Sequence, residues 1–201
     1  MVTINNFKKV AKFLKFDPNK KTVVWVWVAI RAKDNAERIE RTVKSYHIQS
    51  LEEFEKRKKE IMKLCREFHC RAYVCINPKP ILNILFSLQS IVMENIRNEV
   101  NGGTSMLLKG MLDSAVMKSG GADGEKLWIL DVDTTDKDEL AQIINAVKYA
   151  PSGFTNNVVS TVPTAHGYHV ITHPFDTRVL QGTGVEAKKE GLTLLYAYLD
   201  K

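Results

Sequence analysis

Hydrophobic and polar positions divide the first hundred residues into strands and helices. Residues 22–30, TVVWVWVAI, are almost all β-branched or aromatic, which predicts a strand, and residues 33–35 form a polar turn after it. Over residues 51–68 apolar positions recur at helical spacing within a heavily charged segment, which predicts an amphipathic helix. Residues 71–77, RAYVCIN, predict a second strand, and residues 81–100 predict a long, well-buried helix.

Two glycine-containing segments divide the chain in the middle. NGG at residues 101–103 and SGGADG at residues 119–124 are loop signals, and they flank a short helical segment at about residues 105–116. We therefore predict an N-terminal α/β lobe over residues 1–104 and a second lobe over residues 105–201, together one compact unit.

The C-terminal lobe reads as a strand, a helix and three further strands. The predicted strands are 126–133, 157–162, 167–173 and 192–199, and the predicted helix is 135–150. If the segment 174–190 carries a second crossover, this order is a split βαβ, the ferredoxin-like or RRM-like arrangement with an antiparallel sheet. The predicted fold class is therefore α/β (α+β).

The composition is that of an ordinary globular protein with an excess of basic residues. Hydrophobic residues make up 44% of the chain and charged residues 26%, and Lys and Arg exceed Asp and Glu by 29 to 23. The net charge of +6 favours anionic partners such as nucleic acid or nucleotide phosphates. No apolar run reaches the roughly 18 residues of a membrane span, and the N-terminal segment lacks a secretory pattern, so we expect a cytoplasmic protein without membrane association.

The three cysteines, Cys65, Cys70 and Cys75, lie close to His69 in CREFHCRAYVC. Structural zinc sites usually take paired ligands from short knuckles, whereas these cysteines span the junction of a predicted helix and a predicted strand. We therefore expect buried, reduced thiols here.

Two carboxylates stand at the end of the first strand of the C-terminal lobe. Asp131 and Asp133 are two residues apart, so their side chains point to one face of the sheet. In a split βαβ sheet, with strand order 4-1-3-2, the first and third strands are antiparallel neighbours, which places His169 beside these carboxylates. Paired carboxylates suit Mg²⁺ or Mn²⁺, and an imidazole suits a phosphate, as metal-assisted phosphoryl or nucleotidyl transfer requires.

Two short motifs carry these residues. LDVD, residues 130–133, ends a strand, and TVPTAHGYHVIT, residues 161–172, forms a following hairpin. Together they resemble the archaeo-eukaryotic primase superfamily, the primase-polymerase (PrimPol) group. The resemblance implies a minimal catalytic core in which Asp131 and Asp133 bind Mg²⁺ or Mn²⁺ and His169, or alternatively His166, contacts the triphosphate. It further implies nucleotidyl transfer from a nucleoside triphosphate on a single-stranded or primed nucleic-acid template, with replication proteins as partners.

The same family carries a later acidic residue, for which four positions are open. Glu186, Glu190 and Asp176 precede the last predicted strand, on the side of the sheet where Asp133 lies. Asp200 follows that strand and is placed at the far end of the sheet. Glu186 is the preferred third metal ligand.

Basic residues near the predicted cleft are expected to bind phosphates. Arg178, Lys188 and Lys189 lie in the segment before the last strand. From the N-terminal lobe, Arg71 or Lys79 is expected to reach the same cleft.

Two other functions and one structural role fit parts of this pattern. DVDTT matches the D-x-D-x-T motif of haloacid-dehalogenase-like phosphatases, in which Asp131 would be a nucleophile on a parallel sheet. A non-catalytic RRM-like module could instead bind nucleic acid or protein through Tyr168, His169 and Tyr196. Asp133, or Thr134 or Thr135 after it, could also cap the following helix.

Overall fold

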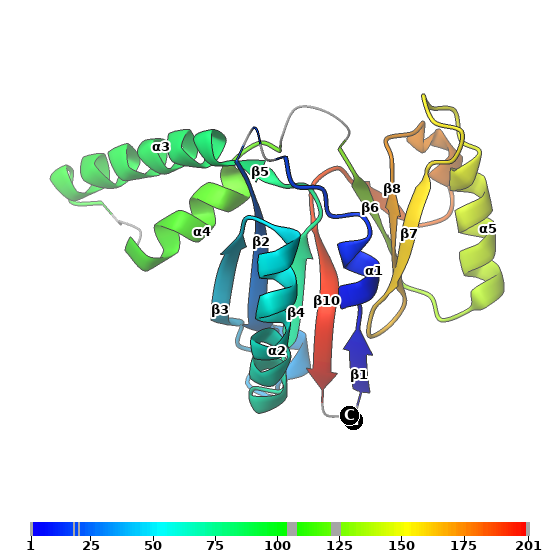
Figure 1. The fold of residues 1–201 in the computed structure, drawn as a ribbon, viewed down its shortest axis with the longest axis horizontal. Coiled ribbons are helices and arrows are strands. Elements are labelled where there is room, and N and C mark those ends of the chain that lie inside the picture. Colours follow the sequence, from blue (N-terminus) through cyan, green and yellow to red (C-terminus); the bar gives the residue numbers. More distant parts are fainter. Residues whose placement is uncertain (1, 18, 20, 104–107, 122–125, 200–201) are drawn as a thin grey trace.

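The protein folds into two antiparallel sheets with helices packed on them, an α/β fold in two lobes as the sequence predicts (Figure 1). The computed structural model describes residues 2–17, 19, 21–103, 108–121 and 126–199. The strands are β1 (Val2–Asn5), β2 (Thr22–Ile30), β3 (Arg41–Ile48), β4 (Arg71–Cys75), β5 (Lys79–Pro80), β6 (Trp128–Val132), β7 (Val158–Pro163), β8 (Tyr168–Thr172), β9 (Glu186–Lys188) and β10 (Leu192–Leu199). The helices are α1 (Phe7–Ala11), α2 (Leu51–Glu67), α3 (Ile81–Val100), α4 (Leu108–Lys118) and α5 (Lys137–Lys148), and the 3-10 turns are η1 (Ala32–Asp34) and η2 (Thr177–Leu180).

The larger sheet, in the order β1-β10-β4-β2-β3 with β5 on β2, packs one face against α1 and α2. We call this the front face. Val24, Val26 and Val28 of β2 point to it and join one core cluster with Phe54 and Ile61 of α2. Because side chains alternate along a strand, the tryptophans of β2 point to the opposite side, the back face. The three cysteines are buried thiols, as predicted.

The smaller sheet has the order β7-β8-β6-β9, and every pairing in it is antiparallel. This is the 4-1-3-2 order of a split βαβ unit, with α5 as the first crossover and η2 in the second connection. Leu140, Ile143 and Val147 of α5 pack on Leu130 and Val170 of the sheet. The opposite face of this sheet is therefore the one that bears Asp131 and His169.

The fourth strand of this sheet is not the predicted one. Residues 192–199 form β10, which lies in the larger sheet between β1 and β4, while the short β9 takes the fourth position beside β6. The physical reason is burial, because β10 is apolar and covered along most of its length, as a central strand must be. Strand β9 exposes Glu186 and Lys188, as an edge strand can.

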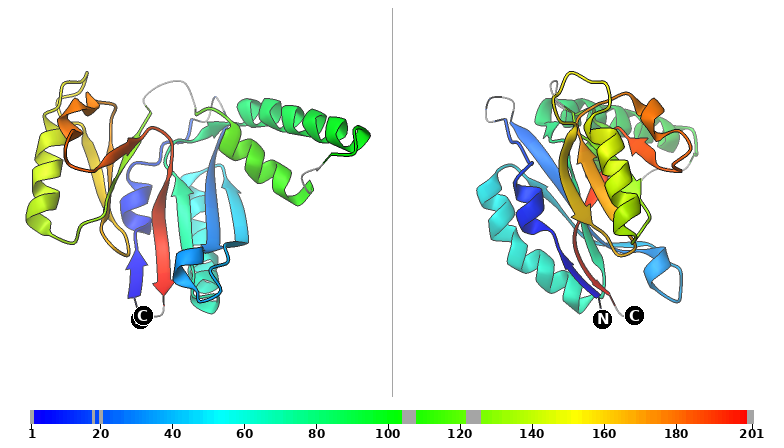
Figure 2. Two further views of the ribbon diagram at one scale, coloured as in Figure 1. Left: turned by 180° about the vertical axis from the view of Figure 1, so that it is seen from behind. Right: turned by 90° about the vertical axis from the view of Figure 1, so that its right-hand side faces the viewer.

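The helices α3 and α4 form a pair that extends from one side of the larger sheet (Figures 1 and 2). The prediction that α3 is well buried is wrong. Ile84 and Ile91 face inward, but Leu82, Leu85 and Phe86 are more than half exposed. The predicted division between residues 104 and 105 lies in the segment 104–107, outside the described residues.

Buried asparagines join the two lobes. The side chain of Asn6 donates to the carbonyl oxygens of Pro163 in β7 (2.9 Å) and Leu194 in β10 (3.0 Å). Asn77 donates to the carbonyl of Leu127 and accepts from its N–H, both at 2.8 Å. These bonds fix the approach of the smaller sheet to the larger one. Among the described residues, no helix is both long and apolar enough to cross a membrane.

Candidate active site

The centre of the candidate site is the pairing of β6 with β8. Asp131 is the direct cross-strand partner of His169, so the predicted juxtaposition of these two residues is confirmed. Asp131 Oδ1 lies 3.4 Å from His169 Nε2. The other ring nitrogen, Nδ1, lies 3.0 Å from Thr193 Oγ1 of β10, a fully buried hydroxyl. The imidazole is thus held between the two sheets.

Asp131 also binds a lysine from the neighbouring edge strand. Lys188 Nζ donates to Asp131 Oδ2 at 2.8 Å, so Lys188 reaches the site but contacts a carboxylate in place of the expected phosphate. The contact with His169, followed by that with Lys188, holds the pKa of Asp131 far below its usual range, against the opposing effect of burial. Asp131 is therefore an anion at neutral pH.

Asp133 lies where the β7–β8 hairpin crosses the end of β6. The N-cap of α5 is Asp136, which accepts from the N–H of Asp138 and of Glu139, so the expectation of a cap at Asp133, Thr134 or Thr135 is wrong. The exposed carboxylate of Asp133 is consequently not used by the helix. A Cβ on Gly167 would lie 2.1 Å from the Val132 carbonyl oxygen, so glycine permits the close approach of the hairpin.

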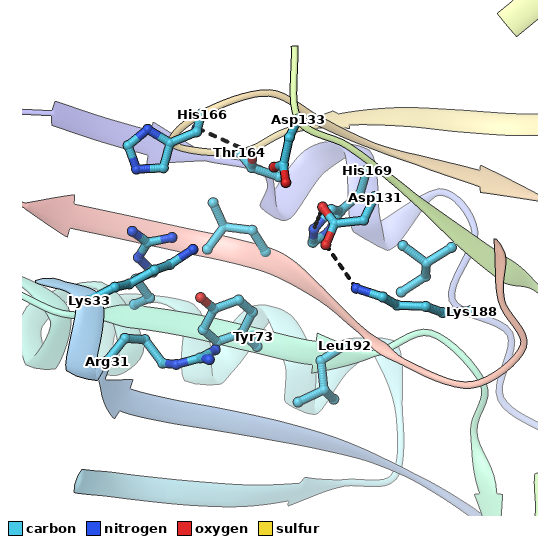
Figure 3. A pocket seen from close by; sticks show the side chains of 13 residues that line it. Arg31, Lys33, Tyr73, Asp131, Asp133, Thr164, His166, His169, Lys188 and Leu192 are labelled. Carbon is cyan, nitrogen blue, oxygen red and sulfur yellow. Dashed lines mark hydrogen bonds and ion pairs between the residues drawn. The ribbon is translucent and has the colours of Figure 1, made fainter. Parts of the chain in front are cut away.

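These side chains border a cavity of about 260 Å³ between the two sheets (Figure 3). One wall is the smaller sheet with its hairpin, and its polar lining residues are Asp131, Asp133, Thr164, His166, His169 and Lys188. The other wall is the back face of the larger sheet, and its lining residues are Arg31, Lys33, Arg71, Tyr73, Leu192 and Leu194. A carboxylate-bearing wall thus faces a cationic wall across a space that can hold a small ligand.

The cations of the second wall differ in their contacts. Arg71, which the sequence placed in the cleft, lines the cavity, but its guanidinium forms two hydrogen bonds to the carboxylate of Asp34, at 2.5 and 2.6 Å. Lys33, which precedes Asp34 in η1, has an exposed side chain without a hydrogen bond or ion pair to any residue that the structure describes. Lys33 can therefore meet an anion directly, whereas Arg71 mainly stiffens the wall.

Three other predicted basic residues lie away from the cavity. Arg178 is exposed and pairs with Asp176 in its own turn. Lys189 lies over the ring of Trp128, which belongs to the core on the α5 side of the smaller sheet. Lys79 is buried and binds Glu190 at 2.7 Å. These contacts also engage Asp176 and Glu190, two of the positions considered for a third carboxylate.

Glu186, the preferred third carboxylate, lies beside Asp131. It is the cross-strand partner of Asp131 on β9, on the side of β6 away from His169, and its side chain is exposed. It does not line the cavity. Among the described residues, no group of three or more His, Cys, Asp or Glu side chains is gathered closely enough to hold a metal ion.

Several residues of the site were not identified from the sequence. Lys33 falls in the predicted polar turn and Arg31 just before it, and Tyr73 and Thr193 lie inside apolar strands. A basic pair directly after a strand was an available signal for the first two. Nothing local marks Thr193, because its role depends on the pairing of β10 with the larger sheet.

Comparisons with models of protein families, with curated proteins and with solved structures found no match to this chain. The functional argument therefore rests on the geometry of the cavity and its residues.

Proposed function

We propose that this protein is a metal-dependent nucleotidyltransferase of the primase-polymerase kind, which acts on a nucleoside triphosphate and a single-stranded or primed nucleic-acid template. The observation that supports this most is the pairing of Asp131 with His169, with Asp133 beside them, opposite the cationic wall of Arg31 and Lys33. Carboxylates for a cation and basic groups for phosphates are the two requirements of phosphoryl transfer.

The carboxylates of Asp131 and Asp133 supply two of the oxygen ligands that a hard divalent cation prefers. Asp131 and Asp133 offer carboxylate oxygens at the border of one cavity, and the depressed pKa keeps Asp131 deprotonated. Glu186, opposite Asp131 on β9, is the proposed third ligand. When bound, Mg²⁺ or Mn²⁺ would neutralise the charge that develops on the transferring phosphoryl group.

The protein's own side chains would bind and orient the triphosphate. Lys33 and Arg31 present cationic groups from the larger sheet, and the imidazole of His169 is fixed in place by Thr193. Lys188 lies on the same cavity wall as Asp131, so it can exchange this carboxylate for a phosphate oxygen. The substrate is thereby held between both sheets, which orients it for attack by a hydroxyl.

The two alternative functions have less support. Strand β6 has antiparallel neighbours on both sides, whereas a dehalogenase-like phosphatase needs its nucleophile on a parallel sheet. Tyr168 and Tyr196 do not form a common surface with His169, because Tyr196 is fully buried in the larger sheet and Tyr168 packs on the α5 side. The aromatic surface expected of the non-catalytic module is therefore not formed by these residues.

Incorporation of a labelled nucleotide on single-stranded and primed templates, with Mg²⁺ or Mn²⁺, tests the proposal. We expect Asp131→Asn and Asp133→Asn to lower incorporation by a factor of about 100 or more, because each removes a charge that the transition state needs. Asp138→Asn changes an exposed aspartate outside the cavity and should retain activity. No incorporation by the wild-type protein with either cation, or equal activity of all three variants, would contradict the proposal.

A further inference from the structure

A row of aromatic side chains crosses the back face of the larger sheet. Trp25 and Trp27 of β2 stack with ring centres 6.0 Å apart, and Tyr73 of β4 lies 5.9 Å from Trp27. Trp25 and Tyr73 are buried, but Trp27 is only half-buried. Helix α4 covers the Trp25 end of the row, where Asp113 accepts from Trp25 Nε1 at 3.1 Å. The accessible part of the row is therefore Trp27 and what lies over it.

The residue over Trp27 is Arg31, which also borders the cavity. Its guanidinium carbon lies 5.5 Å from the ring centre of Trp27 and 5.4 Å from that of Tyr73. The side chain of Arg31 is 32% exposed and is held by Glu40 at 2.7 Å. A positioned guanidinium on aromatic rings is a planar, cationic surface of the kind on which unpaired bases stack. This surface continues into the wall that faces Asp131.

The connection from β2 to β3 adds further cations beside this surface. Lys33 and Arg38 are both exposed. Of the three acidic residues of this connection, Asp34 and Glu40 are paired with Arg71 and Arg31, and the exposed Glu37 offsets one of the two cations. Lys33 and Arg38 also line an open hollow over this connection. Viewed from behind, the back face lies between the smaller sheet and the helices α3 and α4 (Figure 2).

We infer that the back face of the larger sheet binds single-stranded nucleic acid. An unpaired base stacks on the surface formed by Trp27 and Arg31, and Lys33 and Arg38 contact the phosphates. The inference rests on the proposed function, because a strand bound to the back face would serve as the template and would lead to the catalytic cavity. A single strand fits better than a duplex, since a stacking surface is useful only for a base whose face is exposed.

Tryptophan fluorescence during titration with an oligothymidylate tests the stacking. The chain has three tryptophans, and Trp128 lies in the other sheet against Phe175, which makes it a matched control. Trp27→Phe should abolish most of the quenching with little loss of affinity, Trp128→Phe should retain the quenching, and Trp27→Ala should weaken binding roughly tenfold. Thermal melting verifies that each variant is folded. Equal quenching in Trp27→Phe and wild type, or stronger binding to a duplex, would overturn the inference.

The salt dependence of binding tests the phosphate contacts. Lys33→Ala and Arg38→Ala should each reduce the slope of log K against log salt by about 0.7, the value for one phosphate of a single strand. Lys63→Ala changes an exposed lysine of α2, on the front side of the sheet, and should leave the slope unchanged. An unchanged slope in both the Lys33 and the Arg38 variant, or equal binding to polyglutamate, would contradict a nucleic-acid surface.

Asp131→Asn separates this inference from the proposed function. This variant should lose nucleotide incorporation and still bind the oligothymidylate with wild-type affinity, because Asp131 lies on the opposite wall of the cavity. Binding without any incorporation by the wild type would refute only the enzyme proposal. Templated incorporation that is unaffected by Trp27→Ala would refute only the stacking surface.

Discussion

Gly167 determines how closely the β7–β8 hairpin approaches the end of β6. A methyl group there would meet the Val132 carbonyl oxygen at 2.1 Å, the Thr134 nitrogen at 2.9 Å and the Asp133 Cα at 3.1 Å. All three are backbone atoms, which cannot move without shifting β6 or the hairpin. The position of Asp133 relative to His169 therefore depends on the absence of a side chain in the turn.

Gly167→Ala should destabilise the protein by about 1–3 kcal/mol, the usual cost of overpacking, and lower nucleotide incorporation. Urea unfolding measures the first effect and the incorporation assay the second. Gly153→Ala is the matched control, because a Cβ on Gly153 has no atom within 4 Å among the described residues. Equal stability of the two variants would mean that the hairpin tolerates the displacement.

The sequence predicted where the residues of the site lie, but not which side chains they contact. Two-residue alternation placed Asp131 and Asp133 on one face, and the strand order brought His169 to them. The contact between Lys188 and Asp131 was not predicted, because it required knowing that residues 186–188 form a strand beside β6. The N-cap of α5 is Asp136 and not Asp133, Thr134 or Thr135, since the first residue of a helix depends on where the preceding strand ends.

Among the elements, α4 is attached to the larger sheet through a polar contact as well as an apolar one. Asp113 accepts hydrogen bonds from Trp25 Nε1 at 3.1 Å and from Ser45 Oγ at 2.9 Å, and His47 Nε2 lies 3.3 Å away. Burial alone would raise the pKa of Asp113, but the contacts with His47, Ser45 and Trp25 lower it overall. The charged form is thus the one that holds α4 in place.

Asp113→Ala should cost about 2 kcal/mol at neutral pH, because it removes hydrogen bonds to a partly buried charge. Since the pKa of Asp113 is lowered by folding, its contribution is complete above the ordinary carboxyl pKa of about 4 and is lost as the pH falls further. Unfolding free energies from pH 7 to pH 3 should therefore converge for the variant and the wild type. Glu94→Gln, an exposed change on α3, should remain close to wild type throughout.

The elements that the sequence identified are those with long periodic patterns. Strand β2 and helix α2 were predicted almost to the residue. Strand β3, from Arg41 to Ile48, was missed because its outer half is polar and exposed, which leaves little alternation to detect. The sheet that β10 joins was also mispredicted, because a strand that is almost entirely apolar carries no signal for its neighbours.

At the scale of the whole molecule, the two sheets act as one body because buried polar groups tie them together. The carboxamide of Asn77, after β4, satisfies both backbone groups of Leu127 before β6. Ile129 and Ile171 of the smaller sheet join the same core cluster as Val26 and Leu195 of the larger one. The cavity therefore lies in a continuous structure and not in a gap between independent domains.

Asn77→Ala should lower stability by about 2–4 kcal/mol, since it leaves a buried N–H and a buried carbonyl without partners. Far-ultraviolet circular dichroism and Trp128 fluorescence, measured in a background with Trp25→Phe and Trp27→Phe, should still report one coincident transition. Asn83→Ala is the control, because it removes only a long, solvent-exposed hydrogen bond from α3 to the Gly120 carbonyl oxygen. Separate transitions for the two sheets in the wild type would show that the lobes unfold independently.

The place of β10 has a consequence for synthesis on the ribosome. Among the described strands, β1 pairs only with β10, and β10 also covers one edge of β4. Until residues 192–199 emerge, β1 therefore has no partner strand and β4 has one unpaired edge. The larger sheet therefore stays incomplete, with an unpaired strand edge, while the residues of the smaller sheet are translated. Such delayed, long-range pairing slows folding and favours association of unfinished chains. Nascent chains of this protein are therefore expected to depend on chaperones that shield strand edges.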